Sequence, residues 1–499
     1  MNTQDWIKQV VKQEEIDKYL IDGEDFINED QIWNDINSNQ KPSNERIREI
    51  LKKSMNIERL EPDEVAALMA VEDEEMWKEM RNVALEVKKK VYDNRIVFFA
   101  PLYCASYCVN NCAYCGFRCE NKDEKRVILP MDQVRKETEA VVDEGHKRMI
   151  VVFGEHDKSD ADYMAECISN IYSVKRETPT GGGYNNIRRV NVNAAPMSIG
   201  NLKKLWRAGI GTYQVFQETY DKEIYADVHP SNTIKGNYRW RLYALHRAMD
   251  AGIDDVAIGA LFGLADWRFD VMGLIYHAID LERQFGVGPH TISFPRMQPA
   301  PGSYVSEHSD HIVTDEDFKK IVTVLRLAVP YTGLIVTARE EKDIKKEVIS
   351  YGCTQTDASS KIGVGAYSDD QKQEGNEDGV QFMLGDQRSL DEVIRELAEG
   401  GYITSFCTAG YRCGRTGDKI MNLLESGVEG KFCKLNAILT FREYLNDYAS
   451  EETRKVGEVL IEKELKEVEK MPFFTDKKLL KTFKLYYDRV AKGERDIYM

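Results

Sequence analysis

Residues 95–115 read RIVFFAPLYCASYCVNNCAYC, an apolar and aromatic run that is followed at once by closely spaced cysteines. The first part predicts a buried strand, because such side chains pack well on a pleated surface. Cys108, Cys112 and Cys115 come directly after it, at spacings of four and three residues. This places a metal-binding pattern where a strand ends.

Seven further β-rich runs follow, and helical patterns separate them. They are RMIVVFGEH (148–156), RRVNVNAAP (188–196), TYQVFQETY (212–220), DDVAIGALFGL (254–264), HTISFPRMQPA (290–300), GLIVTARE (333–340) and a weaker eighth within CTQTDASSKIGVGAY (353–367). Eight β/α alternations over roughly 290 residues fit an α/β fold, the (βα)8 TIM-type barrel, better than a doubly wound sheet. In such a barrel the segments after the strands form the active face.

Both ends of the chain have helical patterns outside this barrel. Residues 1–85 are acidic and predict a helical N-terminal extension, with Ser43 as a helix cap. We expect the barrel over residues 86–385. Residues 386–499 are expected to form a C-terminal helical domain that carries cysteines.

The charge and the hydropathy exclude two classes of partner. The chain has 68 basic and 84 acidic residues, a formal net charge of -16, which repels phosphate backbones and anionic membrane surfaces. The longest apolar runs, such as 327–338, are too short to cross a bilayer, and the first residues, MNTQDWIKQVVKQEE, lack an export signal. We therefore expect a cytoplasmic protein without a nucleic-acid or membrane partner.

Clustered cysteines in a reducing compartment indicate metal binding or catalysis rather than disulfides. Five of the ten cysteines lie within 104–119 and three within 407–433. Three thiolates on a cubane cluster leave one iron free, whereas a structural zinc site, the alternative, is closed by four ligands. The spacing of Cys108, Cys112 and Cys115 therefore favours a [4Fe-4S] cluster over zinc.

The segment CVNNCAYC resembles the cluster motif of the radical S-adenosylmethionine (SAM) superfamily. The resemblance implies that the free iron chelates SAM, and that an electron from the cluster releases a 5′-deoxyadenosyl radical. Tyr114 occupies the aromatic position that packs beside adenine in this superfamily. Gly154 and Glu155 resemble the glycine-glutamate turn whose backbone binds the SAM amino group.

Two further strand ends resemble the places where this superfamily contacts ribose and adenine. Glu218 lies near the end of the fourth β-rich run, and Ile258 and Gly259 lie in the fifth. A buried glutamate needs a partner to offset its desolvation, and SAM would supply one. An ion pair between Glu218 and Arg239 or Arg241 is the alternative.

Longer stretches resemble one family, the tyrosine-lysing maturases of [FeFe]-hydrogenase (HydG), and more distantly the 2-iminoacetate synthases (ThiH). They are YCVNNCAYCGF, RVNVNAAPMS, YQVFQETY, WRLYALHRAMDAGIDDVAIGALFGL, FGVGPHTISFPR, QFMLGDQRSLDEVI and SFCTAGYRCGRTG. The resemblance covers nearly the whole chain. It implies a lyase that splits the Cα–Cβ bond of tyrosine into p-cresol and dehydroglycine, and that then makes CO and cyanide on a second cluster.

Two other functions stay open beside that one. A paralogue would stop at dehydroglycine (2-iminoacetate) or act on another amino acid. A non-catalytic iron–sulfur scaffold or carrier would need labile cysteines but no SAM-binding strand ends, so Gly154, Glu155 and Glu218 argue against it. The lyase would also need a reduced electron donor such as ferredoxin or flavodoxin.

The resemblance extends to the substrate-binding residues. Arg339, at the end of the seventh β-rich run, is expected to bind the tyrosine carboxylate, because a planar guanidinium holds a carboxylate through two hydrogen bonds. Arg296 is the second candidate, and a surface arginine is the alternative for both. His290 looks like the ligand of an extra iron, with a merely hydrogen-bonded histidine as the alternative. Gln298 replaces a charged residue of the family near the substrate.

The C-terminal cysteines depart from the pattern of the family. Where the family reads CTAC this chain reads CTAG, so that Gly410 stands in place of a cluster ligand. Cys407 and Cys433 remain at family positions, and Cys413 lies three residues beyond Gly410. A second iron–sulfur cluster is therefore either rebuilt around Cys413, which we favour, or absent. Reconstitution should give about eight irons per chain in the first case and about four in the second.

Overall fold

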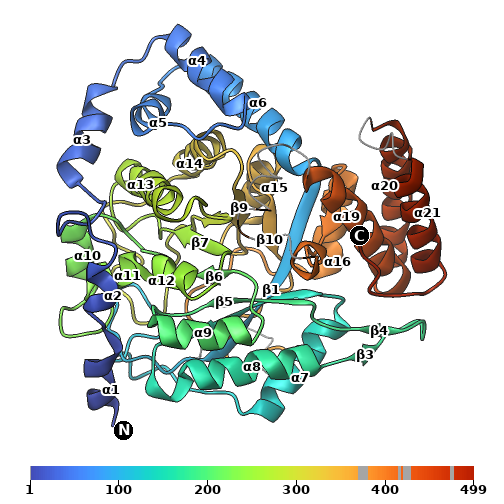
Figure 1. Ribbon diagram of the computed structural model, residues 1–499, viewed down its shortest axis with the longest axis horizontal. Helices are drawn as coiled ribbons and strands as arrows, with labels where there is room; N and C mark the ends of the chain where they lie inside the picture. The colour runs from blue at the N-terminus through green and yellow to red at the C-terminus, as the bar shows by residue number, and fades with distance from the viewer. Residues whose placement is uncertain (1, 369–379, 414–416, 418, 420–428, 472–476) are drawn as a thin grey trace.

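The computed structural model describes residues 2–368, 380–413, 417, 419, 429–471 and 477–499. Eight parallel strands form a closed barrel at its centre, because β10 pairs with both β9 and β1 (Figure 1). The barrel strands are β1 (Arg95–Ala105), β2 (Arg148–Phe153), β5 (Arg189–Asn193), β6 (Tyr213–Gln214), β7 (Val256–Gly259), β8 (Thr291–Ser293), β9 (Gly333–Val336) and β10 (Gln355–Asp357). The predicted TIM-type barrel is confirmed, and each strand falls within one of the eight β-rich runs.

Helices cover the outside of the barrel and connect its parallel strands. They are α7 (Met131–Asp143), α8 (Ala161–Ser173), α9 (Ile199–Arg207), α10 (Lys222–Val228), α11 (Tyr238–Leu242), α12 (Ala244–Asp250), α13 (Trp267–Phe285), α14 (Asp315–Ala328) and α15 (Lys342–Tyr351). Side chains of Asp160, Ser198 and Thr314 cap the first turns of α8, α9 and α14. Gly286, with φ 72°, ends α13 in the left-handed conformation that favours glycine.

The N-terminal helices form a layer along one side of the barrel (Figure 1). They are α1 (Thr3–Val10), α2 (Glu14–Asp17), α3 (Glu29–Ser38), α4 (Asn44–Met55), α5 (Pro62–Met69) and α6 (Glu74–Tyr92). The cap at Ser43 is confirmed, since its side chain accepts a hydrogen bond from Arg46 N. α6 packs on α14 and α15 and leads almost directly into β1, so the proposed domain boundary at residue 85 falls inside this helix.

The C-terminal part is helical, as its pattern indicates, but it also adds a strand. It contains α16 (Leu390–Glu399), β11 (Ile403–Ser405), α17 (Ala409–Arg412), α19 (Glu429–Asp447), α20 (Glu451–Lys470) and α21 (Lys477–Ala491). β11 pairs with the first residues of β1, outside the barrel. This strand and the short hairpin of β3 (Arg176–Glu177) and β4 (Tyr184–Asn185) were not predicted, because two or three residues are too few to show a period. No described helix is long and apolar enough to span a bilayer.

A buried ion cluster joins α19 to the barrel. Glu443 Oε2 lies 2.8 Å from Arg188 Nη2 and 3.3 Å from Lys147 Nζ, and the three side chains are at most 1% exposed. Burial by itself raises the pKa of Glu443, but the two cations outweigh this effect and hold the pKa below its usual value. Glu443 therefore pairs with Lys147, and it shares the neutralisation of Arg188 with Asp496, whose Oδ1 lies 3.1 Å from Arg188 Nε.

We predict that Glu443→Gln lowers the free energy of unfolding by about 3–5 kcal/mol, because it removes the carboxylate that pairs with the buried Lys147 and leaves the buried Arg188 paired with the half-exposed Asp496. Glu458→Gln, in the neighbouring helix α20, is the matched control. It removes the ion pair between Glu458 and Arg442, which is partly exposed and contributes about 1 kcal/mol or less. Urea unfolding followed by circular dichroism measures both. Since the pKa of Glu443 is lowered in the fold, its contribution should be complete at neutral pH and decline as the pH falls through that pKa. An equal loss of unfolding free energy in the two variants would contradict the role of Glu443 in neutralising the buried cations.

Candidate active site

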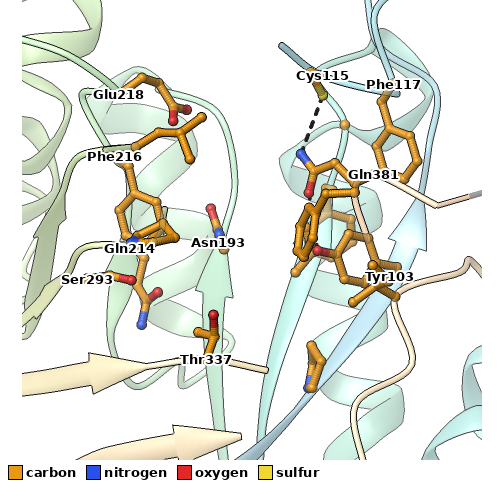
Figure 2. A pocket seen from close by; sticks show the side chains of 18 of the residues that line it. Tyr103, Cys115, Phe117, Asn193, Gln214, Phe216, Glu218, Ser293, Thr337 and Gln381 are labelled. Carbon is orange, nitrogen blue, oxygen red and sulfur yellow. Dashed lines mark hydrogen bonds between the residues drawn. The ribbon is translucent and has the colours of Figure 1, made fainter. Parts of the chain in front are cut away.

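A large cavity opens where the barrel strands end, and it holds about 1540 Å³ of empty space including its mouth. Figure 2 shows two facing walls. One carries Gln214, Phe216 and Glu218, and the other carries Tyr103 and Cys115 with further labelled side chains. TIM barrels carry their active sites at this end of the strands. The cavity is therefore the candidate active site.

The three cysteines of the motif all line this cavity. Backbone hydrogen bonds hold their loop, among them Val109 N to Glu155 O at 2.8 Å. Burial raises the pKa of Cys108 to about 11 and that of Cys112 to about 12, so that metal binding must displace the thiol protons. No three His, Cys, Asp or Glu side chains in the described part of the chain converge on a single metal ion. A cubane distributes its ligands over several irons, and the residues fit this group better than zinc.

Tyr114 lies in the cavity wall with its ring fixed on two sides. Its Oη shares a hydrogen bond of 2.9 Å with His229 Nε2, and Lys235 Nζ lies 5.3 Å from the ring centroid. Tyr114 is only 8% exposed. The ring can therefore offer a fixed apolar edge to a planar base beside the cysteines, as predicted for adenine.

Gly154 and Glu155 bring the end of β2 against the cysteine loop. A Cβ atom on Gly154 would lie 2.2 Å from Tyr107 O, so only glycine fits there. Glu155 Oε2 accepts a hydrogen bond of 2.6 Å from Asn110, whereas Oε1 is buried without a hydrogen-bond partner among the described residues. Burial raises the pKa of Glu155. A ligand ammonium group would satisfy this carboxylate.

Glu218 is both paired within the protein and part of the cavity wall. Its Oε1 lies 2.8 Å from Lys235 Nζ and 2.9 Å from Arg241 Nη2, which confirms the ion pair with Arg241, whereas Arg239 binds Asp25 instead. Burial raises the pKa of Glu218, but the two cations outweigh it and the net pKa is lowered. Its φ of 74° is strained for a residue other than glycine. The fold thus holds this charge cluster in place at the cavity.

Ile258 and Gly259 are not among the residues that line the cavity, and their contact with a ligand stays a prediction. Ile258 is fully buried in the apolar core. A Cβ on Gly259 would lie 2.4 Å from the ring of Phe216, so this glycine makes room for a wall residue. Leu261, two residues beyond β7, contributes the wall side chain on this part of the barrel.

The two candidate arginines differ in their position relative to the cavity and in their ion pairs. Arg339 lines the cavity, its guanidinium carbon lies 3.2 Å from the ring centroid of Phe382, and it has no ion pair with a described residue. Arg296 does not line the cavity, and it pairs with Glu340 and, at 2.8 Å, with Asp315. The charge of Arg296 is already neutralised, so the second candidate for the carboxylate is not supported.

His290 lies at the start of β8, at the opposite end of the barrel strands from the cavity. It is 9% exposed, and its Nδ1 lies 3.3 Å from Asp255 Oδ1. Burial raises the pKa of Asp255, but His290 and Arg189 outweigh it and lower the pKa. His290 thus pairs with a residue of the protein, as the alternative interpretation expects. The role of His290 as an iron ligand stays a prediction.

Cys407 and Cys433 line a second, smaller pocket, of about 360 Å³, together with Gly410. Cys413 is exposed and does not line this pocket. Its backbone N–H donates to Ala409 O at 3.1 Å, so that the helical turn carries its side chain past the pocket. The structure therefore does not support the prediction that Cys413 replaces the missing ligand.

Sequence reasoning missed several residues of the cavity wall. Lys235 follows α10 in a loop without a motif, and Gln381 and Phe382 come after the last barrel strand. Only long-range contacts bring them to the cavity. Asn110 could have been found, because it stands inside the cysteine motif and binds Glu155.

Comparisons with known proteins agree with this geometry. The model of the radical SAM superfamily matches residues 102–267, and that of the Biotin and Thiamin Synthesis associated domain matches residues 293–403. The 2-iminoacetate synthase of Salmonella typhimurium is 28% identical over 357 residues, which cover 70% of this chain and 88% of that protein.

Two solved structures are similar over nearly the whole chain. A crystal structure of HydG, a maturase of the [FeFe]-hydrogenase, is 44% identical with a TM-score of 0.88, and the match covers 95% of this chain and 100% of that chain. HydG from Carboxydothermus hydrogenoformans is 36% identical with a TM-score of 0.76, over 95% and 99% of the two chains. This chain therefore belongs to the HydG family, and it is a radical SAM lyase with a [4Fe-4S] cluster and SAM as cofactors.

Proposed function

We propose that this chain cleaves the Cα–Cβ bond of tyrosine to give p-cresol and dehydroglycine. The observation that carries the proposal is the cation of Arg339, which faces the same cavity as Cys108, Cys112 and Cys115 and has no described carboxylate partner. A buried cation of this kind needs an anion, and the carboxylate of an amino acid supplies it.

The other walls suit the aromatic part of tyrosine. Phe216 and Tyr103 offer apolar contact from opposite sides of the cavity (Figure 2). Asn193, Gln214 and Ser293 bring polar groups that can bind a phenol hydroxyl. An apolar cavity with a few polar groups at defined places is typical of small-molecule sites.

Residues of the chain also fit the cofactors. When bound, the cluster and SAM supply the 5′-deoxyadenosyl radical. Cys108, Cys112 and Cys115 would hold the cluster, the unpaired oxygen of Glu155 would accept from the amino group of SAM, and Tyr114 would pack beside adenine. A small low-potential electron carrier, such as ferredoxin or flavodoxin, would provide the electron.

The C-terminal pocket favours release of dehydroglycine over its conversion to CO and cyanide. That conversion uses a second cluster, which needs three thiolates, and among the described residues Cys407 and Cys433 are the cysteines that line the pocket. Full hydrogenase maturation is the second candidate, supported by the identity of 44% to a HydG structure. The two candidates share the first reaction and differ in the fate of its product.

We predict that Cys112→Ala abolishes both the cluster and the formation of 5′-deoxyadenosine, since two thiolates cannot retain a cubane. Cys119→Ala is the matched control from the same loop and should keep about four irons per chain. Iron analysis after anaerobic reconstitution, with circular dichroism as the test of folding, measures the first effect. If the wild-type protein with an intact cluster forms neither 5′-deoxyadenosine nor p-cresol from SAM, reductant and tyrosine, the lyase proposal fails.

Arg339→Ala should raise the KM for tyrosine about 30- to 1000-fold, which corresponds to about 2–4 kcal/mol for a lost charge-assisted pair, while SAM binding is preserved. Arg296→Ala serves as the comparison. It should lower stability, because the buried carboxylate of Glu340 loses its ion-pair partner, and it should leave the KM for tyrosine unchanged. Steady-state assays of p-cresol check both. An unchanged KM in Arg339→Ala would exclude this residue as the carboxylate anchor.

For the C-terminal pocket, the exposed position of Cys413 favours fewer irons than the roughly eight expected from the sequence. We predict about four irons per chain in the wild-type protein, no change in Cys413→Ala, and dehydroglycine without CO among the products. Iron analysis and trapping of CO by reduced haemoglobin measure these outcomes. About eight irons, with a fall to about four in Cys413→Ala, would restore the maturase candidate.

A further inference from the structure

Residues 380–385 run between the cysteine loop and the residues after β9, and Gln381, Phe382 and Leu384 of this segment line the cavity. Two backbone hydrogen bonds hold this segment at its ends, Gly116 N to Gln381 O at 3.3 Å and Gly385 N to Ala338 O at 2.8 Å. The backbone thus fixes the position of Gln381 independently of its own side chain.

The side chain of Gln381 contacts a cysteine of the cluster motif. Its Nε2 donates to Cys115 Sγ over 3.5 Å, and Tyr103 Oη donates to its Oε1 over 3.2 Å (Figure 2). An iron-bound thiolate can only accept, so it selects the orientation of the amide that turns nitrogen towards sulfur. The contact of Asn110 with Cys108 is longer, at 3.7 Å.

We propose that Gln381 is a positioning residue that sets the reduction potential of the cluster through an N–H···S hydrogen bond to Cys115. Reduction adds negative charge to the cluster and its thiolates. A donor aimed at one of these sulfurs therefore stabilises the reduced form more than the oxidised form and raises the potential. The inference rests on the cluster and not on the identity of the amino-acid substrate.

The same segment also reaches the substrate end of the cavity. Phe382, the next residue, stacks on the guanidinium of Arg339 at 3.2 Å. One dipeptide thus contacts both a cluster ligand and the cation proposed for the substrate carboxylate. A role of Gln381 that consisted only of fastening this segment would leave the potential of the cluster unaffected.

The test is a redox titration of the reconstituted cluster, followed by electron paramagnetic resonance in the absence of tyrosine. In Gln381→Leu we expect the midpoint potential to shift to a more negative value while about four irons are retained. Gln298→Leu is the matched control, because Gln298 also lines the cavity and has no described contact with a cysteine. It should leave the potential at the wild-type value.

Gly116→Ala tests the geometry without removing the amide. A Cβ there would lie 2.8 Å from Val380 O and 3.1 Å from Gln381 O, so the segment must move away from the cysteine loop. We expect a negative shift of the potential that is smaller than in Gln381→Leu. A wild-type potential in Gln381→Leu, with its irons in place, would overturn the proposal.

If Gln381→Leu does not retain the cluster, the wild-type protein decides the question. In protein labelled with ¹⁵N at glutamine side chains, the reduced cluster should show a ¹⁵N hyperfine coupling by electron–nuclear double resonance. The absence of that coupling would refute the hydrogen bond. These readouts need no turnover, so a failure of the tyrosine lyase proposal leaves them interpretable.

Discussion

The end of β2 approaches the cysteine loop so closely that no side chain fits at residue 154. The Cβ of any other residue would lie 2.2 Å from Tyr107 O. Because of this contact, Glu155 receives the backbone hydrogen bond of Val109 and the side-chain hydrogen bond of Asn110 from within the loop. The cysteine loop and the carboxylate of Glu155 are thus held together by this one close approach of backbones.

The barrel and the cysteine motif could be predicted because both are local. A strand shows itself in a few consecutive side chains, and ligands three and four residues apart need no knowledge of the rest of the chain. Sequence alone did not show which side chain near the end of β7 the barrel turns towards the cavity: Ile258 is buried in the core, and Leu261 lines the wall.

Other features depend on contacts between distant segments. Cys115 and Gln381 are far apart in the sequence, so their hydrogen bond could not be predicted from it. Lys235 pairs with Glu218 because the loop after α10 returns to the mouth of the barrel. Cys413 shows the reverse case. Its nearness in sequence to Cys407 suggested a shared ligand set, but a single helical turn directs it to solvent. Spacing predicts a ligand set only when the local backbone is known.

The pairing of β1 with β2, β10 and β11 has a consequence for synthesis of the chain. Gln355, the first residue of β10, follows Ala105, the last of β1, by 355 − 105 = 250 residues. At roughly 5–20 residues per second, a ribosome needs about 13–50 seconds to make that stretch. During this interval one edge of the first strand has no partner strand from its own chain, and such an edge can pair with another molecule. The edge of β1 that β10 later covers is therefore open to such pairing until translation has passed residue 357.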